Sequence, residues 1–212
     1  PRTIEGPLYV AGAPMSEGFA RIDDGSDESA ETMILTGQVT DENGQPVANA
    51  VVDVWHANTM GNYSYFDQSQ TDYNLRRRIK TDENGRYTAR SIIPAGYGCP
   101  PEGSTQALLN LLGRHGNRPA HIHFFISKPG YKHLTTQINL AGDEYTYDDF
   151  AFATREELVV EANRIEDPAK AEQFGLNKPF TEVEFNIQLV ATDKPELQSR
   201  HERKRALEGE AA

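Results

Sequence analysis

Residues 119–127 read Pro-Ala-His-Ile-His-Phe-Phe-Ile-Ser, and this segment decides both the fold and the chemistry of the chain. Its run of apolar side chains indicates a buried β-strand. Successive side chains of a strand point to opposite faces, so His121 and His123 share one face and Ile122 takes the other. Both imidazoles can therefore point at one metal ion.

The histidine pair alone leaves the kind of site open. Buried histidines are also common as hydrogen-bonded core residues, so a His-X-His pair on a strand is weak evidence of a metal. Where such a pair does bind a metal, it suits zinc, copper or ferrous iron with an added carboxylate. The rest of the sequence must distinguish these readings.

Outward from this segment the chain repeats a pattern of short strands and tight turns. Residues 35–40 form an expected strand that ends at the Asn-Gly turn of residues 41–46, and a second Asn-Gly turn at 82–85 introduces residues 86–89. Repeated units of this kind predict a mainly β fold, an antiparallel β-sandwich with short peripheral helices. The other expected strands cover residues 50–56, 134–140 and 183–190.

The expected helices are short. Residues 104–112 fit one helix, with Gly113 as its stop signal. Residues 154–160 fit another, because Thr154 and Glu157 have the spacing of a capping box. Residues 168–174 fit a third.

The remaining segments divide the chain into a catalytic domain and a tail. Residues 4–10 are an expected extended arm, and residues 12–32, rich in Gly, Ser, Asp and Glu, an expected surface loop. We expect one domain over residues 1–194, which includes the arm. Residues 195–212 form a charged tail with few large apolar residues.

Composition excludes several classes of protein. The formal net charge of −11 argues against nucleic-acid binding, since an acidic chain gains nothing from counterion release. No apolar run is long enough to span a bilayer, and no signal peptide is visible. Cys99 is the single cysteine, so no internal disulfide can form, which fits a cytoplasmic protein.

Two tyrosines in turn-rich segments narrow the choice of metal. Tyr63 follows Gly-Asn, and Tyr97 stands between glycines at the start of residues 96–101. A phenol is a poor ligand until it loses its proton near pH 10, which a strongly Lewis-acidic ion can force. Tyrosinate is a hard, electron-rich donor that favours ferric over ferrous iron. In a chain of nine tyrosines most are nevertheless structural.

Several stretches together resemble the intradiol ring-cleavage dioxygenases and, within that family, the catechol 1,2-dioxygenases. The resemblance covers roughly residues 2–190. These motifs are far more specific in combination than the histidine pair alone. The stretches that carry the resemblance are residues 3–14, 54–58 with 61–63, 96–103, 113–123, 142–145 and 148–154.

The resemblance implies a ferric, non-haem iron, one per chain, completed by a hydroxide. The family's two tyrosine ligands match Tyr63 and Tyr97, and its two histidine ligands match His121 and His123. Tyr97 corresponds to the tyrosine that leaves the iron when substrate binds. Arg118 matches the active-site arginine and Gln137 a nearby polar residue, both expected to take part in catalysis. Arg118 also belongs to the expected substrate site, whose other members are Ile4, Pro7, Leu8, Phe150 and Ala151.

The resemblance also implies a reaction and partners. The substrates would be catechol and O2, the product cis,cis-muconate, and the setting the catabolism of aromatic compounds. Family members usually carry a helical N-terminal segment before the Ile-Glu-Gly-Pro motif, which here begins at Ile4. We therefore expect a homodimer if the natural protein carries that segment.

Three alternatives stay open. The Asn-Gly turns also occur in structural sandwich modules that carry no chemistry, and fold similarity alone does not establish function. A family member could act on chlorocatechol, hydroxyquinol or protocatechuate instead. The histidines could hold zinc.

The other polar residues that stand out are given structural readings. His56 is expected to be a structural residue, and Cys99 a small buried side chain. The run of three arginines at 76–78 is expected to be a solvated charged face. His115 receives no chemical role, and His133 and His201 are expected at the surface.

Overall fold

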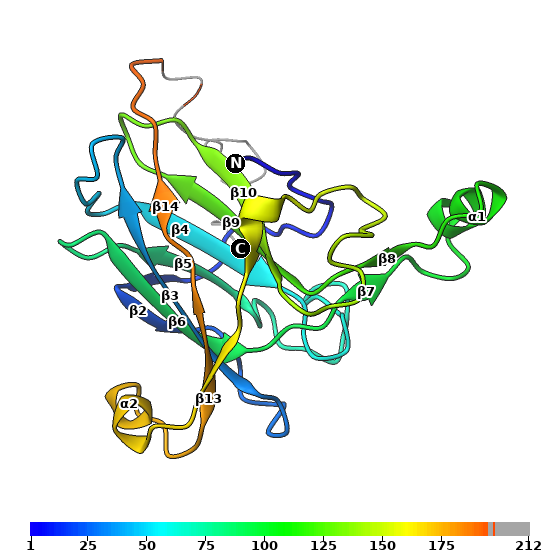
Figure 1. The fold of residues 1–212 in the computed structure, drawn as a ribbon, viewed down its shortest axis with the longest axis horizontal. Helices are drawn as coiled ribbons and strands as arrows, with labels where there is room; N and C mark the ends of the chain where they lie inside the picture. The colour runs from blue at the N-terminus through cyan, green and yellow to red at the C-terminus, as the bar shows by residue number, and fades with distance from the viewer. Residues whose placement is uncertain (195–196, 198–212) are drawn as a thin grey trace.

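The computed structural model describes residues 1–194 and 197, and these form two stacked sheets (Figure 1). The first sheet has the strand order β1-β5-β4-β9-β10-β11. Its strands are β1 (Met15–Glu17), β4 (Val51–His56), β5 (Arg76–Lys80), β9 (His121–Ser127), β10 (Leu134–Leu140) and β11 (Val159–Val160).

The second sheet has the order β12-β13-β3-β6-β2, and β14 also pairs with β3. The prediction of a mainly β sandwich is confirmed. The strands of this layer are β2 (Phe19–Arg21), β3 (Thr32–Thr40), β6 (Arg86–Ile92), β12 (Asn163–Ile165), β13 (Phe180–Glu184) and β14 (Ile187–Gln188).

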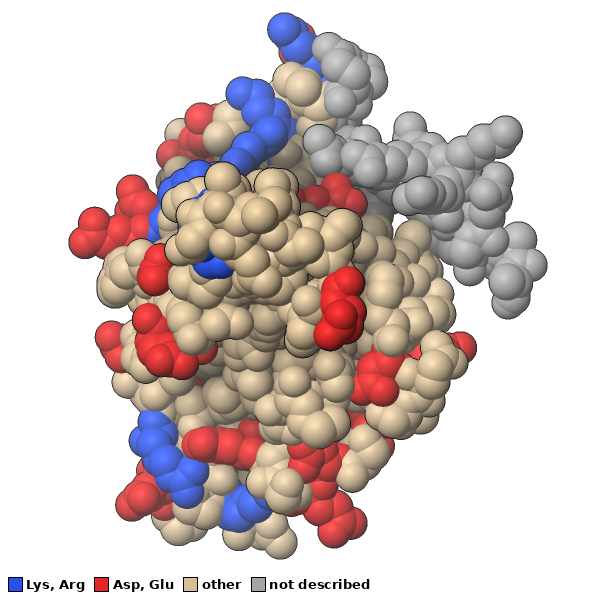
Figure 2. Space-filling model, turned by 90° about the vertical axis from the view of Figure 1, so that its right-hand side faces the viewer, with Lys and Arg blue, Asp and Glu red and all other residues tan. Residues whose placement is uncertain are grey.

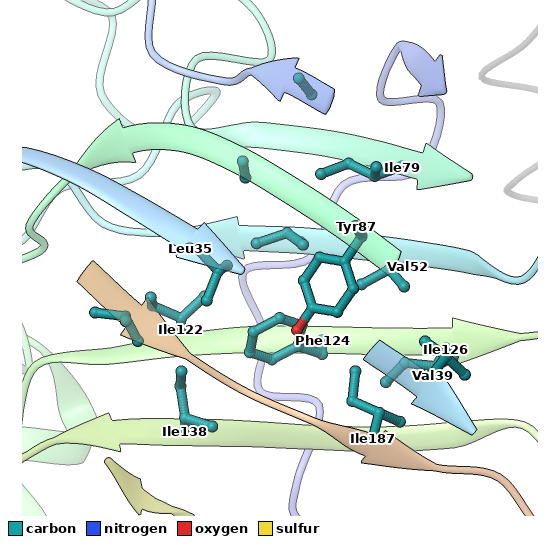
Figure 3. Packing of buried hydrophobic residues seen from close by; sticks show 14 of the residues in the cluster. Leu35, Val39, Val52, Ile79, Tyr87, Ile122, Phe124, Ile126, Ile138 and Ile187 are labelled. Atoms are coloured by element: carbon teal, nitrogen blue, oxygen red, sulfur yellow. The ribbon is translucent and has the colours of Figure 1, made fainter. Parts of the chain in front are cut away.

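The main core lies between the two sheets (Figure 3). Strand β9 contributes Ile122, Phe124 and Ile126, which all point into this space. Leu35 of β3 and Tyr87 of β6 meet them from the second sheet. Because a strand alternates its side chains, the odd-numbered residues of β9 face the other way, away from the core.

Both sheets are mixed rather than wholly antiparallel. The central pairs β4–β5, β4–β9, β9–β10 and β3–β6 are antiparallel. The pairs β1–β5, β2–β6, β10–β11, β3–β13 and β3–β14 are parallel. A tight turn forces its two strands to be antiparallel, whereas strands joined by longer connections can also pair in parallel.

The strand predictions hold with two changes. Residues 134–140 form β10 as expected, and residues 183–190 are divided between β13 and β14. The expected surface loop of residues 12–32 includes β1 and β2, which extend the edges of the two sheets.

The helix predicted over residues 154–160 is wrong. The chain forms a short 3₁₀ helix η1 (Glu156–Leu158) and then strand β11, and no side chain caps the turn. Val159 and Val160 pair with the edge of β10 instead. β-Branched residues fit a pleated edge well, so tertiary pairing overrides the capping-box pattern.

The helices α1 (Ser104–Leu111) and α2 (Pro168–Gln173) confirm the other two predictions. Helix α1 projects from the right of Figure 1 and faces the viewer of Figure 2, where the centre of the surface is uncharged. It joins two short strands, β7 (Tyr97–Gly98) and β8 (Asn117–Arg118), which pair with each other.

The N-terminal arm lies outside the strands of both sheets. Residues 1–14 run over the outer face of the first sheet, where the Thr3 amide donates to Thr135 of β10 and the Tyr9 hydroxyl to Asp53 of β4.

Within the described residues, none of the helices combines the length and apolarity needed to cross a bilayer. The predicted tail of residues 195–212 lies outside the described residues, apart from Leu197.

Candidate metal centre

His121 and His123 lie side by side on the outer face of β9, as their spacing predicts. Their Nε2 atoms are 3.1 Å apart. The Nδ1 atom of His121 is 2.6 Å from the carbonyl oxygen of Pro119, so this nitrogen carries the proton and donates it. Nε2 of His121 is therefore the acceptor nitrogen of this ring.

His123 is held by aromatic packing. Its ring stacks on Trp55 with a centroid distance of 4.8 Å and an interplanar angle of 7°. Trp55 lies opposite His123 in the register of β4 and β9, so the sheet itself sets this stack. The N-terminal arm passes over the pair at Gly6, where an added Cβ would lie 3.7 Å from Cε1 of His123.

The two tyrosines reach the histidines from neighbouring loops. An added Cβ at Gly61 would lie 2.6 Å from the carbonyl oxygen of Gly96 and 2.8 Å from Cβ of Tyr97, so only glycine permits this approach. The close approach brings the rings of Tyr63 and Tyr97 to a centroid distance of 5.6 Å. The Tyr63 hydroxyl is 3.5 Å from Nε2 of His121.

Arg118 closes the site from the β8 side. It stands opposite Tyr97 in the β7–β8 ladder. Its Nη1 atom is 3.4 Å from the Tyr97 hydroxyl and 3.0 Å from Nε2 of His121. Its Nη2 atom donates to Oε1 of Gln137 at 3.1 Å, and Gln137 is fully buried opposite His123 in the register of β10.

Burial determines the charge state of these groups in the metal-free protein. Burial, and then the nearby guanidinium of Arg118, lowers the pKa of His121 to about 3. Burial and the neighbouring His121 hold the pKa of His123 well below its usual value. Burial raises the pKa of the Tyr63 phenol above its ordinary value. The metal-free site therefore holds neutral imidazoles and a neutral phenol at Tyr63 near pH 7.

The arrangement fits a metal ion that tyrosine can ligate. Two imidazole nitrogens bound at ~2.1 Å and at right angles to each other stand about 3 Å apart, as these two do. Among the described residues, no group of three or more His, Cys, Asp or Glu is placed to hold a metal. The donors that gather here are two imidazoles and two phenols, and that set suits ferric iron better than zinc.

The expected substrate residues are distributed around this centre, and their role stays a prediction. Leu8 packs in the cluster formed by Trp55, Tyr63 and Phe125, with Tyr97 at its edge. Phe150 and Ala151 are half-buried in the loop that follows Asp149, whereas Ile4 and Pro7 are exposed on the arm. An open hollow of about 520 Å³ is lined by Tyr97 and Arg118 together with Asn117, Asp143, Glu144 and Tyr145.

The structural readings of the other polar residues are confirmed only in part. His56 is structural: its Nδ1 is 2.7 Å from the Ala57 carbonyl oxygen and its Nε2 is 2.8 Å from the Ser91 hydroxyl. Cys99 is half-exposed rather than buried. His133 is buried beneath the arm, where its ring lies 5.1 Å from that of Phe125, and the expectation of a surface position is wrong. His201 lies outside the described residues.

The expectation of a solvated face for the three arginines is wrong for Arg76. This residue is buried, and its Nε donates to the Ser64 hydroxyl at 2.9 Å. Its guanidinium carbon lies 5.7 Å from the centre of the Tyr63 ring. Arg76 lies opposite Trp55 on the outer face of the sheet, where the loop that carries Tyr63 and Ser64 covers it.

The sequence did not reveal two neighbours of the site. Asp149 binds Arg118 through both carboxylate oxygens, and Trp55 stacks on His123. Asp149 lies 31 residues from Arg118 in the sequence, and no local pattern distinguishes it from Asp148. Trp55 could have been found by pairing the strands in register.

Comparison with known proteins identifies the family of this chain. A family model described as "Dioxygenase" matches residues 4–191. A catechol 1,2-dioxygenase of Pseudomonas sp. (strain EST1001) is 62% identical over 200 residues, which are 94% of this chain and 66% of that protein. One of Acinetobacter guillouiae is 61% identical over 191 residues, which are 90% of this chain and 63% of that protein. The chain thus spans somewhat less than two thirds of the length of these curated relatives.

A solved structure is similar over nearly the whole chain. The crystal structure of wild-type Acinetobacter radioresistens catechol 1,2 dioxygenase matches with a TM-score of 0.92 and 59% sequence identity. The match covers 97% of this chain and 67% of that one. The relatives found by sequence and the solved structure found by fold are therefore of the same kind.

Proposed function

The chain belongs to the dioxygenase family, and from that membership we propose that it is an intradiol dioxygenase that opens the ring of catechol. In this reaction the bond between the two hydroxyl-bearing carbons breaks. Both atoms of O2 enter the product, cis,cis-muconate. The observation that carries the proposal is the convergence of two phenols and two imidazoles beside the buried guanidinium of Arg118.

Four side chains would hold one ferric ion: Tyr63, Tyr97, His121 and His123. The iron would supply a Lewis acid and a template that holds both oxygens of the diol and favours their ionisation. The imidazoles are neutral and would need to lose no proton to bind the ion, whereas the neutral phenol of Tyr63 would give up its proton to a strong Lewis acid.

Each of the other residues has a distinct task in this proposal. Tyr97 is less buried than Tyr63 and borders the open hollow, so its phenolic oxygen would be the better placed of the two to accept a proton from the incoming diol. Arg118 keeps its Nη1 directed at the site, where it stabilises negative charge as the ring opens. Gln137 holds the neighbouring nitrogen of that guanidinium.

The apolar surroundings favour a flat aromatic substrate. Leu8, Trp55 and Phe125 pack behind the tyrosines and restrict water at this end of the site. Such a lining suits an unsubstituted or small-alkyl catechol. A structural module with no chemistry gains nothing from buried polar groups that lack full hydrogen bonding, because each of them costs free energy to bury.

The decisive experiment is to supply catechol to the iron-loaded protein in air, follow oxygen uptake and identify the product. We expect one O2 consumed per catechol and cis,cis-muconate as the product. A semialdehyde product would mean extradiol cleavage and would overturn the proposal. Chlorocatechol, hydroxyquinol and protocatechuate, assayed in parallel, distinguish a related substrate from the absence of ring cleavage.

The metal is tested by colour and by removal of one donor. Tyrosinate bound to Fe(III) absorbs visible light, and zinc-bound protein does not. The substitution Tyr63→Phe should remove or strongly weaken this band, or lower the iron content. A Tyr63→Phe protein with the wild-type spectrum and iron content would exclude Tyr63 from the ligand set.

The location and assembly belong to the same proposal. We place the enzyme in the cytoplasm, in the catabolism of aromatic compounds, with residues 1–194 as its catalytic domain. A homodimer is expected if the natural protein carries a helical N-terminal segment. Analytical ultracentrifugation of the natural protein and of residues 1–194 tests this, because the segment should shift the mass from monomer to dimer.

A further inference from the structure

Three of the five N–H groups of Arg118 form hydrogen bonds away from the metal centre. A guanidinium has five N–H groups in a rigid, planar fork. Nε and one Nη2 hydrogen go to the carboxylate of Asp149, each at 3.1 Å, and the second Nη2 hydrogen goes to Gln137 at 3.1 Å. Only Nη1 remains for the site, where it meets the Tyr97 hydroxyl and Nε2 of His121.

Asp149 holds the guanidinium of Arg118 in place. It is buried, and its pKa lies below its ordinary value: burial alone would raise it, but the hydrogen bonds and charge of Arg118 outweigh that effect. The carboxylate of Asp149 contacts the guanidinium of Arg118 through two parallel hydrogen bonds. Such a bidentate contact fixes the rotation of the guanidinium as well as its position. An arginine held only by Gln137 could turn and present a different nitrogen.

The same carboxylate also shapes the adjoining loop. Oδ1 accepts from the Ala151 amide at 3.1 Å, and Oδ2 accepts from the Ala153 amide at 3.3 Å. Phe150 and Ala151, two of the expected substrate contacts, belong to this loop. Asp149 therefore ties a wall of the substrate site to the guanidinium that faces the reacting groups.

We infer that Asp149 is a positioning residue that aims Nη1 of Arg118 at the metal centre and sets the adjoining loop in register with it. This inference rests on the proposed function, and it adds to that function a residue that holds the arginine in its working orientation. The hydrogen bonds of Asp149 go to Arg118 and to the amides of Ala151 and Ala153, so it acts on the site chiefly by holding the guanidinium and the loop.

The substitution Asp149→Asn removes the charge and leaves an oxygen that can still accept a backbone hydrogen bond. We expect kcat to fall about 10- to 100-fold, as misplacement by about 1 Å can cause, while iron content and the visible band stay unchanged. Asp149→Glu keeps the charge and moves it by one methylene, so its loss of kcat should be smaller. The matched control is Asp148→Asn, which removes the same charge from an exposed neighbour paired with His115.

A double-mutant cycle separates positioning from a general structural role. If Asp149 acts chiefly through Arg118, the pair Asp149→Asn and Arg118→Lys should lose far less kcat than the product of the two single losses. Multiplied effects of the two substitutions would overturn the inference. So would an Asp149→Asn protein with the kcat of wild type.

A measurement without turnover keeps the inference independent of the proposed reaction. In 15N spectra of the metal-free protein, the Nε–H signal of Arg118 is assigned by its loss in Arg118→Lys. We expect it to exchange slowly with water in wild type, Asp148→Asn and Asp149→Glu, and rapidly in Asp149→Asn. Slow exchange in Asp149→Asn would refute the inference, whether or not the wild type cleaves catechol. A wild type that fails to cleave catechol would refute only the proposed function.

Discussion

The two faces of the sheet formed by β4 and β9 use buried histidine for opposite purposes. On the inner face, His56 has both ring nitrogens bonded, one to Ala57 and one to Ser91 of the opposite sheet. On the outer face, His121 and His123 direct their Nε2 atoms at each other. Residue type and burial are the same, so the difference lies in the partners that each face offers.

This contrast shows how a sandwich can carry a reactive site without weakening its core. The inner face is filled by apolar side chains from both sheets, and a polar residue there must be fully satisfied. The outer face is covered by loops and by the N-terminal arm, which can leave donors free for a metal. One strand therefore serves stability and chemistry with alternate residues.

The largest expected effect is the loss of iron when a histidine of the outer face is removed. His121→Ala deletes a ligand, so iron affinity should fall by more than the ~10- to 100-fold that follows loss of an outer-shell partner. The measurement is iron content after dialysis against a chelator, together with the visible band. His56→Gln, the control from the inner face, should keep its iron. Equal iron loss in both variants would refute the division between the faces.

The next effect is on stability and comes from the inner face. Phe124 is fully buried between the sheets, so Phe124→Ala should lower the free energy of unfolding by about 3–5 kcal/mol. Urea unfolding of the metal-free protein measures this loss. Phe66→Ala, at a side chain that is 57% exposed, should change it by less than about 0.5 kcal/mol. A Phe124→Ala protein as stable as wild type would contradict the assignment of the core.

A smaller effect concerns pH and His56. Burial lowers the pKa of His56 to about 4 from an ordinary value of 6.5. The unfolded chain therefore binds this proton more readily than the folded chain does. His56 costs the folded state no stability above pH 6.5, and the free energy of unfolding decreases as pH falls from 6.5 toward 4. Between pH 6 and pH 5 the wild type should lose about 1 kcal/mol more stability than His56→Gln. Equal losses of stability in wild type and His56→Gln, measured by urea unfolding, would show that His56 is not the group that titrates.

Much of the fold could be predicted because local patterns and tertiary pairing agree there. The Asn-Gly turns and the period-two alternation locate β3, β4, β6, β9 and β10 well. The prediction fails where they conflict: the capping pattern at Thr154 is outweighed by the pairing of Val159 with β10. The short edge strands β1 and β2 have no strong pattern of their own, since they exist by pairing with a formed sheet.

The site could be predicted as a set of residues but not as a geometry. Spacing on one strand places His121 beside His123, whereas the approach of Tyr63 depends on the contact of Gly61 with a loop 35 residues away. Asp149 and the buried Arg76 were not found, because charge patterns along the chain do not show which charges a loop will cover. Long-range pairs of this kind follow from topology, which sequence periodicity does not reveal.

The smallest expected effect is a rise in KM for catechol, and it tests whether the arm truly covers the outer face. Gly6 has a φ of +72°, and a methyl group there would lie 3.7 Å from Cε1 and 3.9 Å from Nε2 of His123. Gly6→Ala should cost about 1–2 kcal/mol of stability from the left-handed backbone. The methyl should also raise KM for catechol by occupying space beside the ligand, with the visible band retained.

Gly44→Ala provides the matched control, since its φ is +76° and nothing lies within 4 Å of an added Cβ. It should lose similar stability and keep the wild-type KM. The difference in KM between the two variants therefore isolates the contact with His123 from the strain of the backbone. If both variants show the same KM, the arm does not border the substrate position, and the outer face is closed by the tyrosine loops alone.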